Sequence, residues 1–310
     1  MSLRLTVIRI WAVGVVAASA GILGGCGSAP AVYSSPQLAA SALADATRSG
    51  SKEKLSVVLG TQGADVISSG DEVMDQNDMK AFVVAYDRQN EVVAEAGGSQ
   101  TLLVGQDRWP FPVPIVNRDG GWRFDVEKGR EEITNRRVGR NELNAINVCQ
   151  AIVDAQHEYA RQAGGDPQYA QKFVSDPGKR NGLFWPAADG AAPSPLGPLV
   201  AAATEEGYDL QAIKSGKSAY HGYRYRILTS QGAAAPGGAR DYVIDGKMIG
   251  GFGVVAYPAE YGVTGVMTFI TSHNGVVYQA DLGTDTAKVA QAMTVFNPDS
   301  TWTKVAEDGK

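Results

Sequence analysis

The chain contains few of the residues that hold metals or form disulfides. Its 310 residues include two cysteines, Cys26 and Cys149, and three histidines, His157, His221 and His273. None of the histidines stands at metal-ligand spacing from a second histidine, cysteine or aspartate, so we expect no zinc site and no cofactor. If Cys26 is modified, Cys149 has no partner for an intramolecular disulfide. The apolar stretch around Cys149 predicts a small buried side chain.

An excess of positive charge is also missing. Lys and Arg number 28 and Asp and Glu number 33, which gives a formal net charge of −5. A protein that binds nucleic acid needs a basic surface that contacts the phosphates. A protein that binds an anionic membrane by charge needs a cluster of lysines and arginines. Neither partner is therefore expected for this surface. The Gly-x-Ser-x-Gly and His-Glu-x-x-His patterns are absent as well, so two common hydrolase mechanisms are not indicated.

One long apolar run is present, and it lies at the N-terminus. Residues 10–23 follow two arginines and end at the pair Gly24-Gly25, directly before Cys26. The run is too short to span a bilayer comfortably, and its flanks are those of a cleaved signal. The pattern predicts a bacterial lipoprotein in which residues 1–25 are removed and Cys26 becomes the lipidated N-terminus. An ordinary secretory signal, cut near residues 17–20, is the alternative.

The lipoprotein hypothesis places the protein in the bacterial cell envelope. Two or more acyl chains anchor a protein stably to a membrane. Gly27 stands where an aspartate would favour retention at the inner membrane, so we expect the outer membrane, with the protein facing the periplasm. Residues 26–36 are small and polar, and we expect them to form a tether between the lipid and the fold.

Residues 37–127 are predicted to form an N-terminal α+β subdomain. Apolar residues at helical spacing predict helices over 38–60, with a break at Gly50-Ser51, and over 75–95. Strand patterns follow at 101–104, 111–116 and 122–126. The last two strands flank Asp119-Gly120, a pair that favours a tight hairpin turn. We therefore expect helices packed on a curved antiparallel sheet.

Residues 128–310 are predicted to form a long helix and a C-terminal α+β subdomain. The long helix is expected over 128–163, because an apolar stripe recurs there at helical spacing. Asp245-Gly246 and Asn274-Gly275 predict tight turns between antiparallel strands. The remaining expected elements are helices over 168–174, 199–206 and 286–296 and strands over 223–228, 252–257, 266–271 and 276–279. The fold class expected for the whole chain is α+β.

Short motifs are spread along the chain after the signal. They are Ser68-Ser69-Gly70-Asp71, Gly120-Gly121-Trp122, Asn141-Glu142, Tyr220-His221-Gly222-Tyr223, Gly250-Gly251-Phe252 and the segments 228–232, 256–269 and 275–278. Together they closely resemble the bacterial family known as domain of unknown function 2950. The resemblance implies an envelope protein, and it carries no known activity.

Each half also resembles a known fold. The N-terminal half is similar to a cystatin-like unit of the nuclear-transport-factor-two type, in which small helices pack on a curved sheet. The C-terminal half resembles the globular head of pilin-like proteins, where a long helix leads into a loop and then into strands. The charged segment 131–140 stands where a pilin has an apolar helix, so polymerisation in the manner of a pilin is not expected.

The side chains considered for function lie in the C-terminal half. His221, Gln231, Tyr257, Glu260 and Tyr261 form the candidate binding surface, since tyrosine supplies contact area at low entropy cost. Glu260 lies in a loop between two apolar strands, where desolvation would suit it for acid–base chemistry. The alternatives are that Glu260 locks its turn and that most of the tyrosines pack in the core. No catalytic residue is identified.

These observations favour a non-catalytic binding or assembly module for envelope proteins or polymers. No nucleophile, metal or phosphate-binding pattern argues for an enzyme. The alternative is a hydrolase acting on envelope material, with Glu260, His221 or Gln231 in its site. A third hypothesis is that the N-terminal half carries a small hydrophobic ligand, because its fold type often encloses an apolar pocket.

Overall fold

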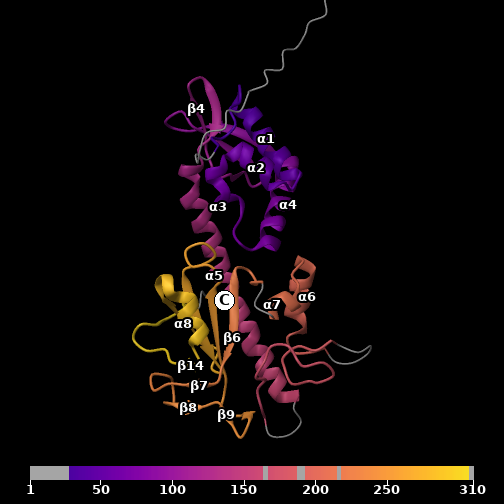
Figure 1. Ribbon diagram of the computed structural model, residues 1–310, viewed down its shortest axis with the longest axis vertical. Helices are drawn as coiled ribbons and strands as arrows, with labels where there is room; N and C mark the ends of the chain where they lie inside the picture. The colour runs from indigo at the N-terminus through magenta and orange to yellow at the C-terminus, as the bar shows by residue number, and fades with distance from the viewer. Residues whose placement is uncertain (1–27, 163–166, 187–192, 215–217, 307–310) are drawn as a thin grey trace, which may run out of the picture.

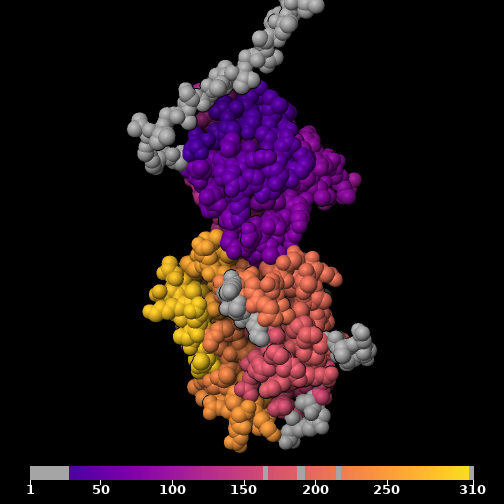
Figure 2. Space-filling model, turned by 45° about the vertical axis from the view of Figure 1, so that its right-hand side comes forward, coloured from indigo at the N-terminus to yellow at the C-terminus, as the bar shows by residue number. Residues whose placement is uncertain are grey.

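The protein consists of two units joined by one long helix (Figure 1). The computed structural model describes residues 28–162, 167–186, 193–214 and 218–306. The units are stacked along the longest axis, with the indigo and purple N-terminal unit at one end and the orange and yellow C-terminal unit at the other (Figure 2). Helices and mainly antiparallel sheets are present in both units, so the predicted α+β class is confirmed.

The N-terminal unit packs short helices on one antiparallel sheet. Its helices are α1 (Pro36–Arg48), α2 (Lys52–Leu59), α3 (Ala64–Ile67) and α4 (Glu72–Arg88). Its strands are β1 (Asn90–Ala94), β2 (Gln100–Val104), β3 (Trp109–Pro110), β4 (Ile115–Arg118) and β5 (Gly121–Phe124). The sheet order is β1-β2-β4-β5, and β3 pairs with β2.

Side-chain caps determine where three of these helices begin. Ser35, Ser51 and Asp71 each accept a hydrogen bond from the backbone N–H three residues later, at the starts of α1, α2 and α4. The backbone at each of these positions is extended, as an N-cap requires. The apolar faces that follow meet the sheet in a core that includes Leu43, Leu55, Leu59, Leu102, Ile115 and Phe124.

In the N-terminal unit, one predicted helix is too long and one predicted hairpin is confirmed. The helix expected over 75–95 ends at Arg88, and residues 90–94 form β1 instead, because they pair with β2 over five residues. The hairpin at Asp119-Gly120 is confirmed. Both residues have positive φ (56° and 78°), which the tight turn between β4 and β5 requires.

The N-terminal segment that we expected to be a tether is bonded to the fold. The backbone N–H of Thr61 donates to the carbonyl of Ser28 over 3.1 Å. Tyr33 and Trp122 exchange two backbone hydrogen bonds of 2.8 and 2.9 Å. The tether prediction is therefore wrong for residues 28–36. Cys26 and the expected signal lie outside the described residues.

Helix α5 (Val126–Gln162) connects the two units. Its 37 residues correspond to about 55 Å at 1.5 Å per residue. The N-terminal part of α5 packs in the N-terminal unit. Its C-terminal part packs on the sheet of the C-terminal unit through Cys149 and Ile152. Burial raises the pKa of the Cys149 thiol to about 12, so the thiol stays protonated and unreactive, as the sequence predicted.

The C-terminal unit is built around a five-stranded antiparallel sheet with the order β15-β13-β12-β11-β6. These strands are β6 (Tyr223–Leu228), β11 (Gly253–Pro258), β12 (Met267–Ser272), β13 (Val277–Asp281) and β15 (Thr303–Lys304). The helices are α6 (Gly197–Glu206), α7 (Leu210–Lys214) and α8 (Thr286–Ala292), and the short strands are β7 (Ser230–Gln231), β8 (Arg240–Asp241), β9 (Val243–Ile244), β10 (Lys247–Met248) and β14 (Val295–Phe296).

Strand β11 lies in the interior of this sheet, as its continuous apolar sequence predicted. All six of its residues are buried between β12 and β6. The buried apolar residues of the C-terminal unit form two clusters, and neither shares a residue with the core of the N-terminal unit. The two halves therefore have separate hydrophobic cores.

Three local predictions in the C-terminal unit are wrong. The helix expected over 168–174 is not formed, because Tyr169 and Val174 form isolated bridges with distant residues and the side-chain amide of Gln156 bonds both the N–H and the carbonyl of Ala170. The last helix ends at Ala292, and β14 follows it because Val295–Phe296 pairs in parallel with β7. Gly275 has positive φ but Asn274 does not, so the predicted type I′ turn is not formed there.

Candidate functional site

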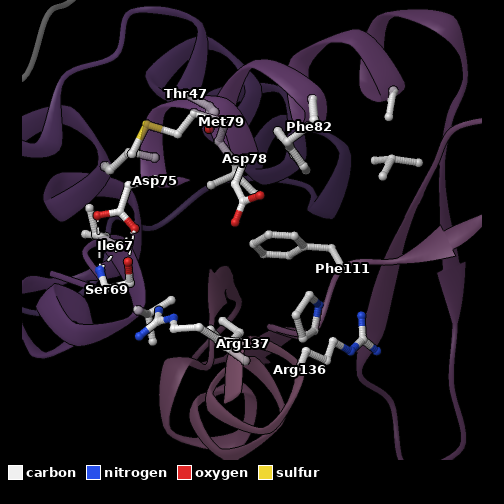
Figure 3. A pocket seen from close by; sticks show the side chains of 18 of the residues that line it. Thr47, Ile67, Ser69, Asp75, Asp78, Met79, Phe82, Phe111, Arg136 and Arg137 are labelled. Carbon is white, nitrogen blue, oxygen red and sulfur yellow. Dashed lines mark hydrogen bonds between the residues drawn. The ribbon is translucent and has the colours of Figure 1, made fainter. Parts of the chain in front are cut away.

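An apolar cavity of about 440 Å³ lies in the N-terminal unit between α4 and α5 (Figure 3). This volume is within the range of ligand pockets, about 300–1,000 Å³. The apolar wall is formed by side chains from the helices and from the sheet. They include Leu43, Leu55, Leu59, Val66, Ile67, Met79, Phe82, Val104, Phe111 and Ile133.

Charged side chains line the cavity from two facing helices. Arg136, Arg137 and Arg140 come from α5, and Asp75 and Asp78 come from α4. The spacings of three and four residues put these side chains on one face of each helix. Figure 3 shows the two aspartates on the α4 side and Arg136 and Arg137 on the α5 side.

Two of the arginines already have partners. Arg140 forms a bidentate ion pair with Asp78, with N–O distances of 3.0 and 2.7 Å. Arg136 donates to Glu132 over 2.6 Å, and its guanidinium lies 4.9 Å from the ring centroid of Trp109. The positive charge of each of these two guanidinium groups is therefore already balanced by a carboxylate.

Asp75 is held by neutral donors instead. Its carboxylate accepts the backbone N–H of Ser69 at 3.1 Å and the Ser69 hydroxyl at 2.6 Å. The hydroxyl of Ser68 donates to the same carboxylate over 3.1 Å. Asp75 thus fixes the loop that precedes α4, and it contributes to the electrostatic field at Arg137 without forming an ion pair with it.

Arg137 is the cation of this cavity that lacks a counterion at contact distance. Its residue is 8 % exposed, and Nη2 donates to the carbonyl of Asp65 over 3.1 Å. No carboxylate oxygen of the described residues lies within 4.0 Å of its guanidinium. Burial lowers the pKa of Arg137, and the charges of Asp75 and Asp65 oppose that shift. A guanidinium has five N–H donors, so most of its hydrogen-bonding capacity is left for a ligand.

A second polar network joins the two units. The buried carboxylate of Asp71 accepts the hydroxyl of Tyr208 over 2.8 Å and the N–H of Gly222 over 3.1 Å, both across the junction. Burial and the neighbouring Asp71 raise the pKa of Tyr208, so its hydroxyl keeps the proton that it donates. Asn77 adds a 2.9 Å hydrogen bond to the carbonyl of Glu206.

Several of the sequence motifs meet at this junction. Asn141 on α5 donates to the carbonyl of Thr264 over 2.9 Å, and Glu142 accepts the N–H groups of residues 266 and 267. Gly222 has a φ of 74°, and a Cβ there would lie 2.5 Å from the Asn141 amide nitrogen. Only glycine fits this position without displacing its neighbours.

His221 and Glu260 lie at the junction. Nε2 of His221 is 3.0 Å from a Glu206 carboxylate oxygen, and its Nδ1 is 3.3 Å from the amide nitrogen of Asn144. Burial lowers the pKa of His221, and the Glu206 charge opposes that shift. The carboxylate of Glu260 lies beside Gly70 of the N-terminal unit. Its turn is locked by backbone hydrogen bonds and by the Thr264 hydroxyl rather than by the carboxylate.

The other three candidate residues have different surroundings. The amide of Gln231 donates to the carbonyls of residues 236 and 238 and accepts the hydroxyl of Tyr242, so it braces its own loop. Tyr257 is 4 % exposed and packs in the C-terminal core. The hydroxyl of Tyr261 donates to Asp281 over 3.2 Å. The structure thus brings His221 and Glu260 to the junction and directs the other three side chains elsewhere.

His273 is partly buried in the C-terminal unit, in the turn that follows β12. Arg240 donates to its Nε2 over 3.0 Å, which requires a neutral ring with the proton on Nδ1. Nδ1 is buried and has no hydrogen-bond partner among the described residues. Burial, with a smaller contribution from the Arg240 charge, lowers the pKa of His273.

We expect this histidine to make the protein less stable in mild acid. The unfolded ring has a pKa of about 6.5 and the folded ring a lower one, so the unfolded state binds the proton first as the pH falls. The free energy of unfolding should therefore decrease below about pH 6.5, until the folded ring also titrates. Urea unfolding between pH 5 and pH 7.5 should show a weaker pH dependence for His273→Gln. An unchanged dependence would contradict the expectation.

The sequence predicts an apolar pocket in the N-terminal half from its fold type, but it does not predict that Arg137 lines it. Arg137 belongs to the charged segment 131–140, which is typical of a solvated face. The one signal is that Ile133 and Arg137 are four residues apart, which puts both side chains on one face of the helix. Among the described residues no group of three potential metal ligands is present, and none of the helices could cross a membrane.

No curated protein and no solved structure matches the chain, so the cystatin-like and pilin-head resemblances of its halves stay predictions. One protein family matches residues 30–305, which include the cavity, the junction and both sheets. This chain belongs to the family described as "Protein of unknown function (DUF2950)".

Proposed function

We propose that this protein is a non-catalytic binding protein whose N-terminal cavity holds a small amphipathic anion. The observation that carries the proposal is Arg137, a buried guanidinium that lines an apolar cavity without a carboxylate at contact distance among the described residues. A buried charge without a partner is costly, typically by several kcal/mol. A ligand carboxylate would supply the counterion and accept two parallel hydrogen bonds, while its apolar part would contact the aliphatic wall.

This proposal combines the binding-module and ligand-carrier hypotheses. The alternative of a hydrolase gains no support from the geometry. Both amide atoms of Gln231 are bonded to residues between 236 and 242, and among the described residues Gln231 shares no hydrogen-bond partner with His221. His221 and Glu260 lie at the junction, where the polar groups bind one another and no activated nucleophile lies beside them among the described residues.

Replacement of Arg137 should abolish selective binding of an apolar anion. We expect decanoate to displace 1-anilinonaphthalene-8-sulfonate from the purified chain more strongly than decanol does. In Arg137→Gln the affinity for decanoate should fall by about tenfold to 100-fold, since hydrogen bonds to charged groups contribute about 1.5–3 kcal/mol. Fluorescence titration measures both effects. The stability of this variant should not decrease, because a buried cation is removed.

The matched control is Arg136→Gln. Arg136 comes from the same turn of α5, but it is paired with Glu132 and stacked on Trp109. This variant should bind decanoate as the unmodified chain does. Equal affinity for decanoate and decanol, or equal loss in both variants, would show that Arg137 does not recognise an anionic group.

We propose in addition that Cys26 is lipidated and that the protein is attached to the envelope membrane. The sequence pattern of residues 1–26 supports this proposal. Ser28 is bonded to Thr61, so only Gly27 separates Cys26 from the folded unit. Two residues reach at most about 7 Å. The N-terminal unit should therefore rest close to the bilayer, where it could exchange an amphipathic ligand with the lipid phase.

Substitution of Cys26 should release the protein from the membrane. Cell fractionation should find the unmodified chain with the membranes and Cys26→Ala in the soluble fraction, since acylation needs the cysteine thiol. Labelling with an alkyne-bearing fatty acid should mark only the unmodified chain. A Cys26→Ala protein that still sediments with the membranes would contradict the lipid-anchor proposal.

A further inference from the structure

Strand β6 ends the C-terminal sheet, and the middle of its outer edge is unpaired. Ala259 donates its N–H to the carbonyl of Gly222, so even-numbered residues turn their backbone groups toward β11 and odd-numbered residues turn theirs outward. At one end of the edge Tyr223 bonds to Tyr220, and at the other Thr229 bonds to residues 242 and 294. Between these ends, the backbone groups of Tyr225 and Ile227 have no partner among the described residues.

A large cavity runs beside this open edge. Its volume is about 920 Å³, and it is lined by residues of β6 on one side and by α6 and the segment around Phe173 on the other. In Figure 1, β6 is on the side of the sheet that faces α6 and α7. Tyr225 and Ile227 both line the cavity, so a molecule in it would meet their outward N–H and C=O groups.

The hydroxyl of Tyr225 is a further unpartnered group at this place. It is buried and has no hydrogen-bond partner among the described residues. Burial raises the pKa of Tyr225 well above its usual value, so the hydroxyl remains a donor. Tyr225 thus lines the cavity with a buried hydroxyl that lacks an acceptor, in addition to the two free peptide units.

The charges of the lining favour an acidic occupant. Lys172, Arg224 and Arg226 line the cavity, whereas Asp176 is its one carboxylate among the lining residues. Lys172 is paired with Asp176, and Arg226 donates to carbonyls at the end of α8. The described lining residues thus carry more positive than negative charge, which suits a ligand with carboxylates and does not suit a basic one.

We propose that this edge binds an extended, acidic polypeptide segment, which adds to the sheet as a strand next to β6. An extended peptide has N–H and C=O groups at the spacing of a neighbouring strand, and alternate side chains would enter the cavity. The section between Tyr223 and Thr229 has room for a segment of about 17 Å, or five residues. This site is separate from the N-terminal cavity, and the inference does not depend on the proposed anion.

Selection from a phage-displayed library of random octapeptides tests this proposal on the purified chain. We expect enriched peptides that are rich in Asp and Glu. The most enriched peptide, once synthesised, should slow amide hydrogen exchange at Tyr225 and Ile227 at least tenfold. Exchange at residues 224 and 226 should stay unchanged, because those amides already face β11. Methylation of alternate backbone nitrogens in this peptide should weaken its binding at least tenfold.

The matched variant is Ile227→Pro. The N–H that it removes points outward, so the ladder with β11 is retained, as proline is tolerated on a sheet edge. Binding of the selected peptide should be lost in Ile227→Pro and reduced in Tyr225→Phe. If Ile227→Pro does not fold, Tyr225→Phe alone tests the proposal. An absence of enriched peptides, unchanged exchange at Tyr225 and Ile227, or full binding by Ile227→Pro would overturn the proposal. A dimer of the chain that Ile227→Pro abolishes would overturn it in favour of a second copy as occupant.

Discussion

Replacement of Asp71 by alanine should lower the free energy of unfolding by about 3–7 kcal/mol. Asp71 caps α4 and accepts hydrogen bonds from Tyr208 and Gly222 across the junction. Loss of the cap costs about 1 kcal/mol, and each buried donor left without a partner costs about 1–3 kcal/mol. For a chain of this size, the melting temperature should fall by about 10 °C, which scanning calorimetry measures.

Ser35→Ala is the matched control for this variant. Ser35 caps α1 in the same way, with a 3.2 Å hydrogen bond from the N–H of Leu38, but it makes no bond across the junction. We expect a loss of about 1 kcal/mol. If Asp71→Ala cost no more than Ser35→Ala, the two hydrogen bonds that Asp71 accepts across the junction would contribute nothing to stability.

Substitution of Gly129 by alanine should also strongly destabilise the protein, although alanine is the better helix former. A Cβ at Gly129 would lie 2.8 Å from the Cα of Val113 and 2.9 Å from the carbonyl oxygen of Pro112. These are backbone atoms, so α5 must move away from the segment between β3 and β4. Overpacking of this kind costs about 1–3 kcal/mol, and it outweighs the gain of about 1 kcal/mol in helix propensity.

Gly139→Ala tests the same substitution in the same helix without the steric conflict. A Cβ at Gly139 would have no atom within 4 Å, so only helix propensity changes. We expect a gain of about 0.5–1 kcal/mol. Urea unfolding of the two variants should thus give changes of opposite sign. Two changes of equal sign would mean that the close approach of α5 to Val113 is not what makes Gly129 necessary.

Elements with a strong local signal could be predicted from the sequence. The long helix, the buried strand β11 and the Asp119-Gly120 hairpin depend on short-range periodicity or on backbone conformations that few residues adopt. The wrong predictions share one cause. Residues 90–94, 168–174 and 295–296 are not helical because a partner distant in sequence pairs with them or bonds to them, and local propensity carries no information about such a partner.

The sites depend still more on distant contacts. Arg137 sits in a segment whose sequence suggests a solvated face, yet it is buried because α3 and α4 fold over that part of α5. His221 and Asp71 are 150 positions apart and reach the same junction only when both units are complete. No composition or spacing argument could have placed them together.

The sequence by itself determined the α+β class, the family motifs and the positions of most helices and strands. These properties follow from apolar periodicity and turn chemistry, which act over a few residues. Only the tertiary structure decided that the halves have separate cores, that Arg137 is buried without a contacting carboxylate and that the middle of β6 remains unpaired. Burial and pairing are properties of the packed chain, because they depend on which distant residues exclude water or supply the missing hydrogen bond.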